Sequence, residues 1–514
     1  MKILCTGDIH IGRRSSRLPE HLDGRAHSCA EAWGRIVEHA LAERVDVVAL
    51  SGDIVDRENR YYEALGPLER GIRRLSEVGI VTVAVAGNHD HDVFPRLADA
   101  LDDRHFRFLG RGGRWERLTI RRGGDVLHVV GWSFPGPYMR TSPLDGLATV
   151  VGGVRGTASG PSSGASRAVE SVVSGEAATA ADGGAPGASP HTSALVLGLL
   201  HADLDQPGSP HAPITLAELR AAPVDFWLLG HVHAPQLHED AGAAPVLYPG
   251  SPQAMDPGEV GAHGVWIVEI DAGRRFHARQ LPLSSVRYDT IEVDVDGVTE
   301  LAEFDSRVTG AVRAHVVAVG AEARSLRCMS CRLRIVGRTP LHRLLDARVR
   351  QLCADLELDD GGVSAVVERA ELATRPARDL VELARGNDPV GVLARLLLTL
   401  ERGAPEGALD GGAVGGHERL LRAAVACMDE VDRARPYLTI ADEAGDFVGR
   451  ATDRGAGVSA GGAVAGSAIT DATGPGRNGT HKPEVDDATR RATRALARQA
   501  SLLLDELLAQ KEGA

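Results

Sequence analysis

The chain of 514 residues is poor in several features, and each shortage narrows the class of protein. It has no apolar run of roughly 18 residues, the minimum for a membrane-spanning helix, so we expect no membrane span. Its six cysteines are scattered and no secretion signal opens the sequence, which favours a reducing cytoplasm over a disulfide-stabilised scaffold. Lysine occurs only at positions 2, 482 and 511, so arginine carries almost all of the positive charge.

Cys328 and Cys331 form a CxxC motif, which raises the question of a zinc site. A structural zinc site needs four ligands, and neither a second CxxC nor a nearby pair of histidines supplies the other two. The surrounding sequence RCMSCRLRIVG is typical of a strand. We therefore predict a strand here, without zinc or redox function.

Five short polar segments are the most informative feature that is present. Each follows an apolar stretch that we predict to be a buried strand, at residues 2–6, 45–51, 80–86, 194–200 and 224–229. The segments read GDIH, GDIVD, GNHD, HAD and GHVH, and they supply Asp8, His10, Asp53, Asp56, Asn88, His89, Asp90, His201, His231 and His233. Because functional side chains of α/β proteins gather at strand ends, we expect these residues to form one site.

The side chains of these segments are suited to a pair of divalent cations. Metals such as Mn²⁺ and Fe²⁺ accept mixed oxygen and nitrogen ligands, and two ions roughly 3.5 to 4 Å apart need a bridging carboxylate, for which Asp53 is the natural candidate. Asp8 and His10 are two positions apart and can reach one ion from the same loop, as can His231 and His233. Any one segment alone could be an ordinary turn or a strand-end histidine, but five in order favour a metal site.

In this order the five segments resemble the calcineurin-like metallophosphoesterase superfamily, over about residues 1–270. Within it, the opening MKILCTGDIHIG, the segment YPGSPQ at 248–253 and the segment LRIVGRTPLHRLL at 333–345 are most similar to bacterial SbcD and YhaO type DNA repair exonucleases. The narrower resemblance depends on these shorter segments.

The resemblance implies a role for each motif residue. One ion would be bound by Asp8, His10, Asp53 and His233, and the other by Asp53, Asn88, His201 and His231. His89 would be the catalytic histidine that protonates the leaving oxygen, and Asp90 would either orient His89 or cap the turn. The two ions would be Mn²⁺, with Mg²⁺ or Fe²⁺ as alternatives.

Asp56 departs from the resembled pattern, because some nucleases of this group have a histidine there that handles the substrate phosphate. An ionised carboxylate is a poor phosphate contact. Arg57 would then take over that role, or the role would be absent.

The order of elements predicts three regions. Residues 1–283 would be the phosphoesterase domain, an α/β sandwich of two sheets flanked by helices at 28–44 and 61–78, with a flexible low-complexity insertion at about 145–192. Residues 284–387 would be a small α+β capping domain with strands at 288–295 and 324–336 and helices at 301–319 and 340–352.

Residues 388–514 would form a helical partner-binding region with stripes of apolar residues at 392–400 and 420–431 and flexible tracts at about 403–416 and 455–479. Its last helix, at about 486–511, would pack against the preceding helices or dock onto the coiled coil of an SbcC-like SMC-type ATPase, which the resemblance implies as a partner.

The net charge of −13 does not decide whether DNA is a partner, because the distribution of charge matters more. Between positions 324 and 350 there are eight arginines and one acidic residue, Asp346. Of these, Arg332, Arg334 and Arg338 are candidate phosphate contacts. The alternative is a solvated surface in an arginine-rich chain.

The sequence therefore predicts a two-metal phosphodiester hydrolase. We expect a DNA exonuclease or endonuclease of double-strand-break repair, cytoplasmic and nucleoid-associated, that acts with the ATPase. The sequence leaves open whether two chains pair, although the resemblance implies a homodimer. The alternative is a phosphoesterase for small phosphodiesters or phosphoproteins, which needs the same ligands but neither a capping domain nor partner helices. A non-catalytic protein with a structural metal site is a third possibility, which the complete ligand set and His89 disfavour.

Overall fold

The computed structural model describes residues 1–402 except 20, 21, 23, 58, 59, 102, 153–170, 175–193, 272, 321 and 322, together with 497, 500–505, 507 and 508. The chain divides into two compact units, Met1–Ala377 and Arg378–Ala514. Among the described residues, no helix has the length and apolar character needed to cross a membrane. The expected tracts at 403–416 and 455–479, the apolar stripe at 420–431 and most of the insertion at 145–192 lie outside the described residues.

The first sheet has six strands in the order β13-β12-β1-β2-β3-β4. In chain order these are β1 (Lys2–Thr6), β2 (Val47–Leu50), β3 (Val81–Ala84), β4 (Phe106–Phe108), β12 (Gly264–Ile270) and β13 (Phe276–Pro282). Strands β1 to β4 run parallel, and β12 is antiparallel to β1. The three predicted strands that precede the first three polar segments are therefore neighbours in one sheet.

The second sheet has seven strands in the order β10-β11-β9-β8-β6-β5-β7. They are β5 (Glu116–Arg122), β6 (Asp125–Gly131), β7 (Ser171–Ser174), β8 (Leu195–His201), β9 (Phe226–Gly230), β10 (Gln236–His238) and β11 (Val246–Tyr248). Parallel pairing of β8 with β9 brings the ends of these two strands together. The polar segments four and five follow these ends.

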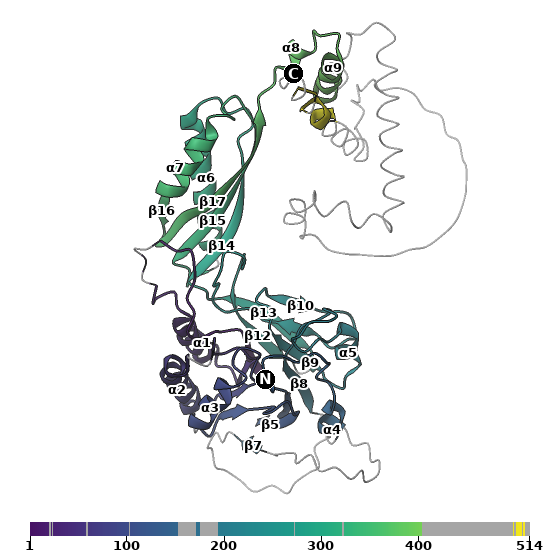
Figure 1. Cartoon of the computed structure of the whole chain (residues 1–514). Helices are drawn as coiled ribbons and strands as arrows, with labels where there is room; N and C mark the ends of the chain where they lie inside the picture. Colours follow the sequence, from purple (N-terminus) through teal and green to yellow (C-terminus); the bar gives the residue numbers. More distant parts are fainter. Residues whose placement is uncertain are drawn as a thin grey trace, which may run out of the picture. The chain divides into compact units, whose positions relative to one another are not determined.

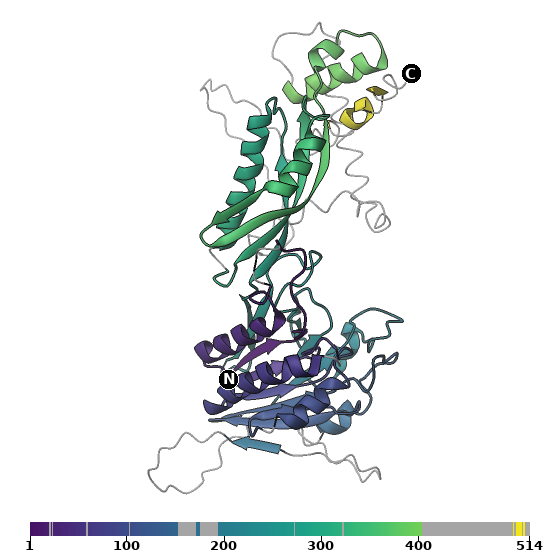
Figure 2. The ribbon, with the colours of Figure 1, turned by 60° about the vertical axis from the view of Figure 1, so that its left-hand side comes forward.

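The two sheets pack face to face, with helices on both outer faces (Figures 1 and 2). Ile3, Val47 and Val81 of the first sheet meet Leu197 and Leu228 of the second in a common core. The outer face of the first sheet packs on α1 (Cys29–Glu43), α2 (Tyr61–Glu77) and α3 (Val93–Ala100), and that of the second on α4 (Leu147–Gly152) and α5 (Leu216–Ala221). The predicted sandwich of two sheets flanked by helices is confirmed.

Helix α1 begins where the sequence predicts, because the Ser28 side chain accepts a hydrogen bond from the Glu31 backbone N–H and caps the first turn. The side chain of Trp33 then packs toward α2. A Cβ atom at Gly71 would lie 2.4 Å from Trp33 Nε1, so glycine is needed where the two helices approach. The Trp33 indole donates to the Pro67 carbonyl at 2.9 Å and fixes this contact.

Residues after 284 form a third sheet, in the order β14-β15-β17-β16. The strands are β14 (Val286–Asp294), β15 (Cys328–Thr339), β16 (Glu357–Asp360) and β17 (Val363–Pro376). Helices α6 (Leu301–Gly320) and α7 (Leu345–Asp355) pack with it around one apolar core. The α+β character is as predicted, but β16 and β17 have no counterpart among the predicted elements.

Cys328 and Cys331 lie on β15, as predicted, and both are fully buried. Burial raises the pKa of both thiols to about 12, so neither is a thiolate at neutral pH.

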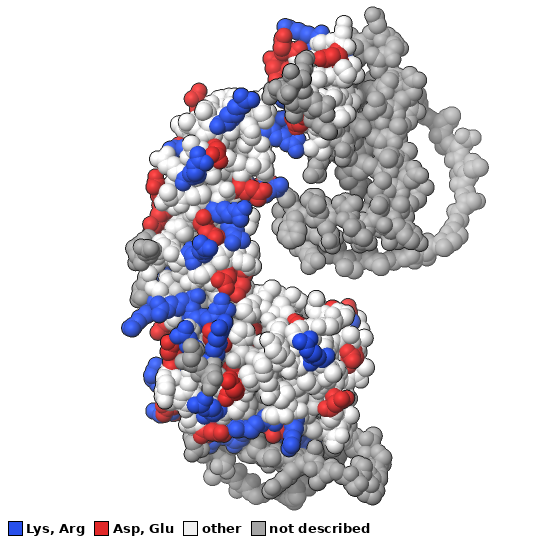
Figure 3. All heavy atoms as spheres, viewed as in Figure 1, with Lys and Arg blue, Asp and Glu red and all other residues white. Residues whose placement is uncertain are grey.

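On the face of the molecule that Figure 3 shows, basic and acidic side chains are interspersed. The arginine-rich stretch of the sequence therefore does not produce a uniformly basic surface in that view.

The second unit is helical where it is described. It contains α8 (Leu380–Leu383), α9 (Pro389–Arg402) and helical residues between 497 and 508. Val390 and Leu397 of α9 pack against Ala500 and Leu504 in one buried cluster. The described part of the last helix thus packs against preceding helices, which is one of its two expected roles.

Candidate metal centre

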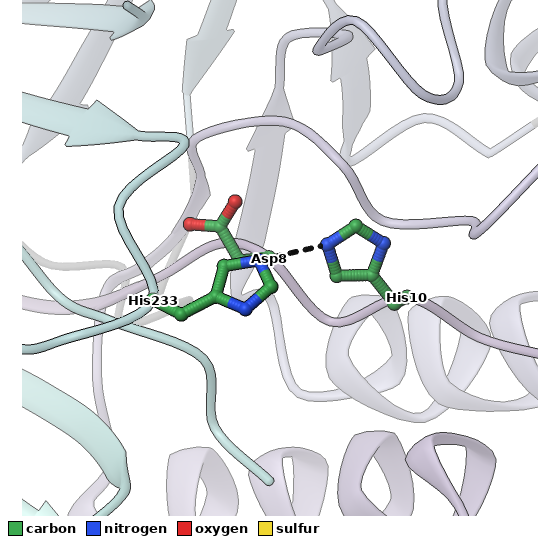
Figure 4. Close-up of side chains that lie close together, drawn as sticks. All are labelled: Asp8, His10 and His233. Carbon is green, nitrogen blue, oxygen red and sulfur yellow. Dashed lines mark hydrogen bonds between the residues drawn. The ribbon is translucent and has the colours of Figure 1, made fainter. Parts of the chain in front are cut away.

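The five polar segments converge at one edge of the sandwich. Three of them follow the ends of the parallel strands β1, β2 and β3, and the other two lie at the ends of β8 and β9. Figure 4 shows Asp8, His10 and His233 side by side, although His233 is more than 200 residues away from the other two in the sequence. The fold therefore assembles in space what the sequence distributes over several loops.

Four of the candidate ligands have a left-handed backbone, which residues with a Cβ atom rarely adopt. Their φ angles are +48° at Asp8, +51° at His10, +49° at Asp53 and +101° at His231. They account for almost half of the described non-glycine residues with positive φ. Such local strain persists where the surrounding structure compensates for it, and it is concentrated at functional sites.

Two glycines allow the loops to approach one another around Asp53. A Cβ atom at Gly87 would lie 2.1 Å from Asp53 Oδ1, and one at Gly52 would lie 2.8 Å from His201 Nδ1. Gly52 also has a φ of +94°. A side chain at either position would displace a candidate ligand.

A first group of ligand atoms consists of Asp8, His10 and His233, whose donor atoms all lie within 4.8 Å of one another. The Nε2 atoms of His10 and His233 are 3.2 Å apart. Asp53 Oδ2 lies 3.8 Å from His10 Nε2. Two imidazole nitrogens and two carboxylates thus surround one position.

A second group of ligand atoms shares Asp53 Oδ2 with the first. His201 Nε2 is 3.4 Å from Asp53 Oδ2 and 3.1 Å from Asn88 Oδ1. His231 Nδ1 is 3.2 Å from the same amide oxygen. Asp53 is thus shared between the two groups, as a bridging carboxylate must be, and the mixed oxygen and nitrogen donors fit two divalent cations.

Each candidate imidazole ligand directs its second nitrogen at an oxygen. The pairs are His201 Nδ1 with the Ser51 carbonyl at 3.0 Å, His233 Nδ1 with Glu259 Oε1 at 2.8 Å, His231 Nε2 with Asp203 Oδ1 at 3.3 Å and His10 Nδ1 with Asp56 Oδ1 at 3.5 Å. A hydrogen-bonded oxygen fixes the tautomer and orientation of a metal-binding histidine, and His201 and His233 have such a partner. The contacts of His231 and His10 are longer, and His10 Nδ1 makes no hydrogen bond with the residues that the structure describes. Asp56 therefore faces a ligand, which leaves it unsuited to contact a phosphate.

Two of these partners, Glu259 and Asp203, are missing from the predicted site. Asp203 stands two positions after His201, so the spacing offered a weak signal. His211 is also absent from the prediction, and its donor atom lies within 4.8 Å of those of Asp203 and His231. Glu259 follows the YPGSPQ segment, and nothing local in the sequence links it to His233.

Charge at the site is arranged around buried carboxylates. Burial opposes ionisation of Asp53, but His201, His10 and His89 outweigh it and hold the pKa of Asp53 well below its usual range. Burial likewise lowers the pKa of His201, but Asp53 raises it to about 9. A metal ligand must be deprotonated, so a cation bound here would compete with that proton.

His89 is half-buried and is fixed at the edge of the centre by two contacts. Its backbone N–H donates to Asp53 Oδ1 at 2.9 Å, and its Nδ1 lies 3.1 Å from the Asp56 carbonyl oxygen. Its ring meets that of His10 edge to face, with 4.9 Å between the ring centroids. With Nδ1 engaged, Nε2 is the ring nitrogen that can exchange a proton with a bound molecule.

Asp90 connects two of the loops through hydrogen bonds to backbone groups. Its buried carboxylate accepts hydrogen bonds from the backbone N–H groups of Ile54 at 2.7 Å, Gly87 at 2.8 Å and Val55 at 3.3 Å. Burial, followed by the nearby Asp53, raises the pKa of Asp90 to about 7. Of the two roles expected for Asp90, these contacts fit turn capping.

The four candidate phosphate-contacting arginines lie near other groups of the protein. Arg57 is exposed, with its Nε 3.8 Å from Asp56 Oδ2. On β15, Arg332 pairs with Glu368 at 3.0 Å and Arg334 with Glu292 at 2.8 Å. Arg338 Nη1 donates to the Pro376 carbonyl at 3.3 Å. The structure therefore brings together the candidate metal ligands and His89, with Arg57 beside Asp56, while the three arginines of β15 contact other groups of the same domain.

Two family models match the chain. Residues 1–235 match the model of the calcineurin-like phosphoesterase family, and residues 288–375 match the middle domain of metallophosphoesterase YhaO.

Curated relatives match part of the chain at low identity. The uncharacterized metallophosphoesterase YhaO of Bacillus subtilis is 26% identical over 279 residues, 53% of this chain and 58% of the relative. The DNA double-strand break repair protein Mre11 of Methanopyrus kandleri is 24% identical over 306 residues, 57% of each chain. Mre11 of Haloferax volcanii is 34% identical over 137 residues, 25% of this chain and 26% of the relative. The chain thus spans about half the length, or less, of the curated relatives it matches.

The family match and the geometry of the candidate ligands both indicate that the amino-terminal domain is a metallophosphoesterase. A metallophosphoesterase fold implies a dinuclear divalent metal site, and the described part of the chain contains candidate ligand groups that share Asp53. The chain is therefore a relative of YhaO and Mre11 proteins whose amino-terminal domain belongs to the calcineurin-like metallophosphoesterase family, a family of metal-dependent phosphoester hydrolases.

Proposed function

We propose that this protein is a two-metal phosphodiesterase that cleaves DNA, as an exonuclease or endonuclease of double-strand-break repair. The observation that carries the proposal is the position of Asp53 between two groups of ligand atoms, with His89 beside them. Such a centre suits hydrolysis of a phosphate ester.

In this proposal Asp8, His10, Asp53 and His233 hold one ion, and Asp53, Asn88, His201 and His231 hold the other. Mn²⁺ is the metal we propose, because the donors are mixed oxygen and nitrogen atoms without thiolate. When bound, two such ions supply Lewis acidity toward the phosphate and a hydrolytic nucleophile.

The protein's own side chains would donate the proton and orient the metal ligands. His89, held through Nδ1 by the Asp56 carbonyl, presents Nε2 to the leaving oxygen and donates the proton that it needs. Glu259 and Asp203 hold His233 and His231 in the orientation that metal binding requires.

DNA as the substrate is supported by the relatives named as DNA double-strand break repair proteins and by the YhaO-type middle domain. The second candidate substrate class is a small phosphodiester or a phosphoprotein. One observation favours it: Arg332 and Arg334 are paired with Glu368 and Glu292, which weakens the phosphate-binding capacity of β15.

We also propose an SbcC-like SMC-type ATPase as a partner of the second unit, and a homodimer acting at the nucleoid in the cytoplasm. Leu503 of the last helix is 48% exposed and Val392 of α9 is 55% exposed, although their helices share a buried cluster. Exposed apolar side chains beside a packed helix cluster are suited to a helical partner.

The His89→Gln variant tests the proton donor. Its turnover of a thymidine dinucleotide should fall by about 10² to 10⁴. Turnover of methyl p-nitrophenyl phosphate should fall far less, because p-nitrophenolate leaves without a proton. The metal content and the thermal unfolding temperature of the His89→Gln variant should match those of the wild type. The control variant is His39→Gln on α1. Equal losses on both substrates would show that His89 is not the general acid.

The substrate class is tested by incubating the purified protein and Mn²⁺ with end-labelled duplex DNA, a p-nitrophenyl phosphodiester and a phosphoserine peptide. We expect cleavage of DNA and of the phosphodiester, but not of the phosphopeptide, and no cleavage after chelation of the metal. Hydrolysis of only the small esters would remove DNA from the proposal.

The partner is tested by co-purification with an SbcC-like ATPase of the same organism. Truncation after residue 387 should abolish binding. Leu503→Asp should weaken binding while preserving folding, because this side chain is 48% exposed. Unchanged binding of the truncated chain would eliminate the docking role of the second unit.

A further inference from the structure

An exposed tyrosine, Tyr138, lies close to the second group of candidate ligands. Of the Tyr, Phe and Trp side chains that the structure describes, only Tyr62 and Tyr138 are more than half exposed, at 88% and 63%. The Tyr62 ring contacts Tyr61 on α2. The Tyr138 ring instead stacks on the imidazole of His211, with 6.0 Å between the ring centroids and 28° between the ring planes.

His211 connects Tyr138 to the candidate metal centre. The centroid of the His211 ring lies 4.7 Å from that of His231, which is a candidate ligand of the second ion. Tyr138 is therefore separated from a candidate ligand by a single imidazole ring. Neither Tyr138 nor its stacking contact takes part in the site described above.

Backbone hydrogen bonds hold the Tyr138 ring over the His211 ring. The Met139 N–H donates to the Pro210 carbonyl at 2.7 Å, and the Ala212 N–H donates to the Met139 carbonyl at 2.7 Å. These bonds involve the residues next to Tyr138 and next to His211. The relative position of the two rings is thus fixed by the backbone on both sides of the contact.

The segment that leads to the exposed ring is also attached to the centre at its other end. The Phe134 N–H donates to the Ala86 carbonyl at 3.2 Å, directly before the third polar segment. The Phe134 ring meets that of His201 edge to face, with 5.7 Å between the centroids. Pro135 and Pro137 follow and restrict the backbone φ angles. The segment therefore contacts one histidine of the second group and reaches the other through a single ring.

An aromatic ring held in this way is suited to stacking. One face of the Tyr138 ring lies against His211, and an exposed fraction of 63% leaves surface for a second ring. Tyrosine offers a large contact area at a low cost in side-chain entropy, and this ring is already held in position. Stacking of a nucleobase on an aromatic side chain is worth roughly tenfold or more in affinity and does not depend on which base is present.

We propose that Tyr138 determines substrate specificity by stacking on a nucleobase of the substrate. A sugar separates a nucleobase from its phosphate, so a phosphate at the second ligand group would place a base at such a distance from His231. The proposal depends on the proposed phosphodiesterase function and names its substrate class as nucleotides or nucleic acids, in preference to phosphate esters without a base.

A binding experiment tests the stacking without catalysis. Two labelled pentanucleotides with phosphorothioate linkages, which resist hydrolysis, are compared by fluorescence anisotropy in the presence of Mn²⁺. One is pentathymidylate, and the other has the same linkages but no bases. We expect the wild type to bind pentathymidylate about tenfold more tightly than the abasic chain, and we expect Tyr138→Ala to lose this preference.

Two further variants serve as controls. Tyr138→Phe keeps the ring and should keep the preference within about twofold of the wild type. Tyr62→Ala removes the other exposed tyrosine and should bind as the wild type does. Thermal unfolding of Tyr138→Ala should match the wild type, because the side chain is largely exposed.

A kinetic experiment separates base stacking from a structural role of Tyr138. Thymidine 5′-(p-nitrophenyl phosphate) and thymidine 3′-(p-nitrophenyl phosphate) are compared with methyl p-nitrophenyl phosphate, which has no base. For at least one thymidine ester, we expect the KM relative to that of the methyl ester to rise about tenfold in Tyr138→Ala. Displacement of His231 through His211 would affect all three esters equally and leave this ratio unchanged, which would contradict stacking.

The outcomes separate this proposal from the proposed cleavage of DNA. Loss of the binding preference in Tyr138→Ala supports nucleobase stacking even if duplex DNA is not cleaved. If the wild type does not distinguish the two pentanucleotides, or if Tyr138→Ala retains the preference as Tyr62→Ala does, Tyr138 does not stack on a base and the proposal is overturned.

Discussion

The position of the Asp53 carboxylate is the constraint on which the rest of the centre depends. This buried group lies within 4 Å of His10 on one side and of His201 on the other. Its backbone is left-handed and its Oδ1 accepts from the His89 N–H. Any displacement of Asp53 would therefore change both ligand groups and the nearby histidine together.

Asp90 links the conformations of the second and third loops. Its carboxylate bridges the N–H groups that follow Asp53 and the N–H of Gly87, so the two loops are held at a fixed spacing. That spacing is close enough to require glycine at position 87. The strain at Asp53 is thus compensated by hydrogen bonds outside the ligand set, as is common at functional sites.

The sequence predicted the parts of the structure that depend on local patterns. Apolar stretches marked β1, β2, β3, β8 and β9, the Ser28 cap marked the start of α1, and the five segments marked the candidate ligands. Parallel strands then brought these segments to one edge. What the sequence could not provide are contacts made only by the fold, such as that between His233 and Glu259.

The remaining differences between prediction and structure also involve contacts between segments that are distant in the sequence. Asp90 stands next to His89 in the sequence, but its carboxylate also accepts hydrogen bonds from the backbone of Ile54 and Val55, and adjacency in the sequence does not indicate these contacts. Strand β17 completes a sheet through pairing with β15, which no local pattern specified.

The most direct test of this account is a crystal structure of the protein with Mn²⁺, with diffraction data collected on both sides of the manganese absorption edge. The account predicts two anomalous peaks on either side of the Asp53 carboxylate, one beside Asp8, His10 and His233 and the other beside Asn88, His201 and His231. A single peak, or peaks away from Asp53, would contradict it.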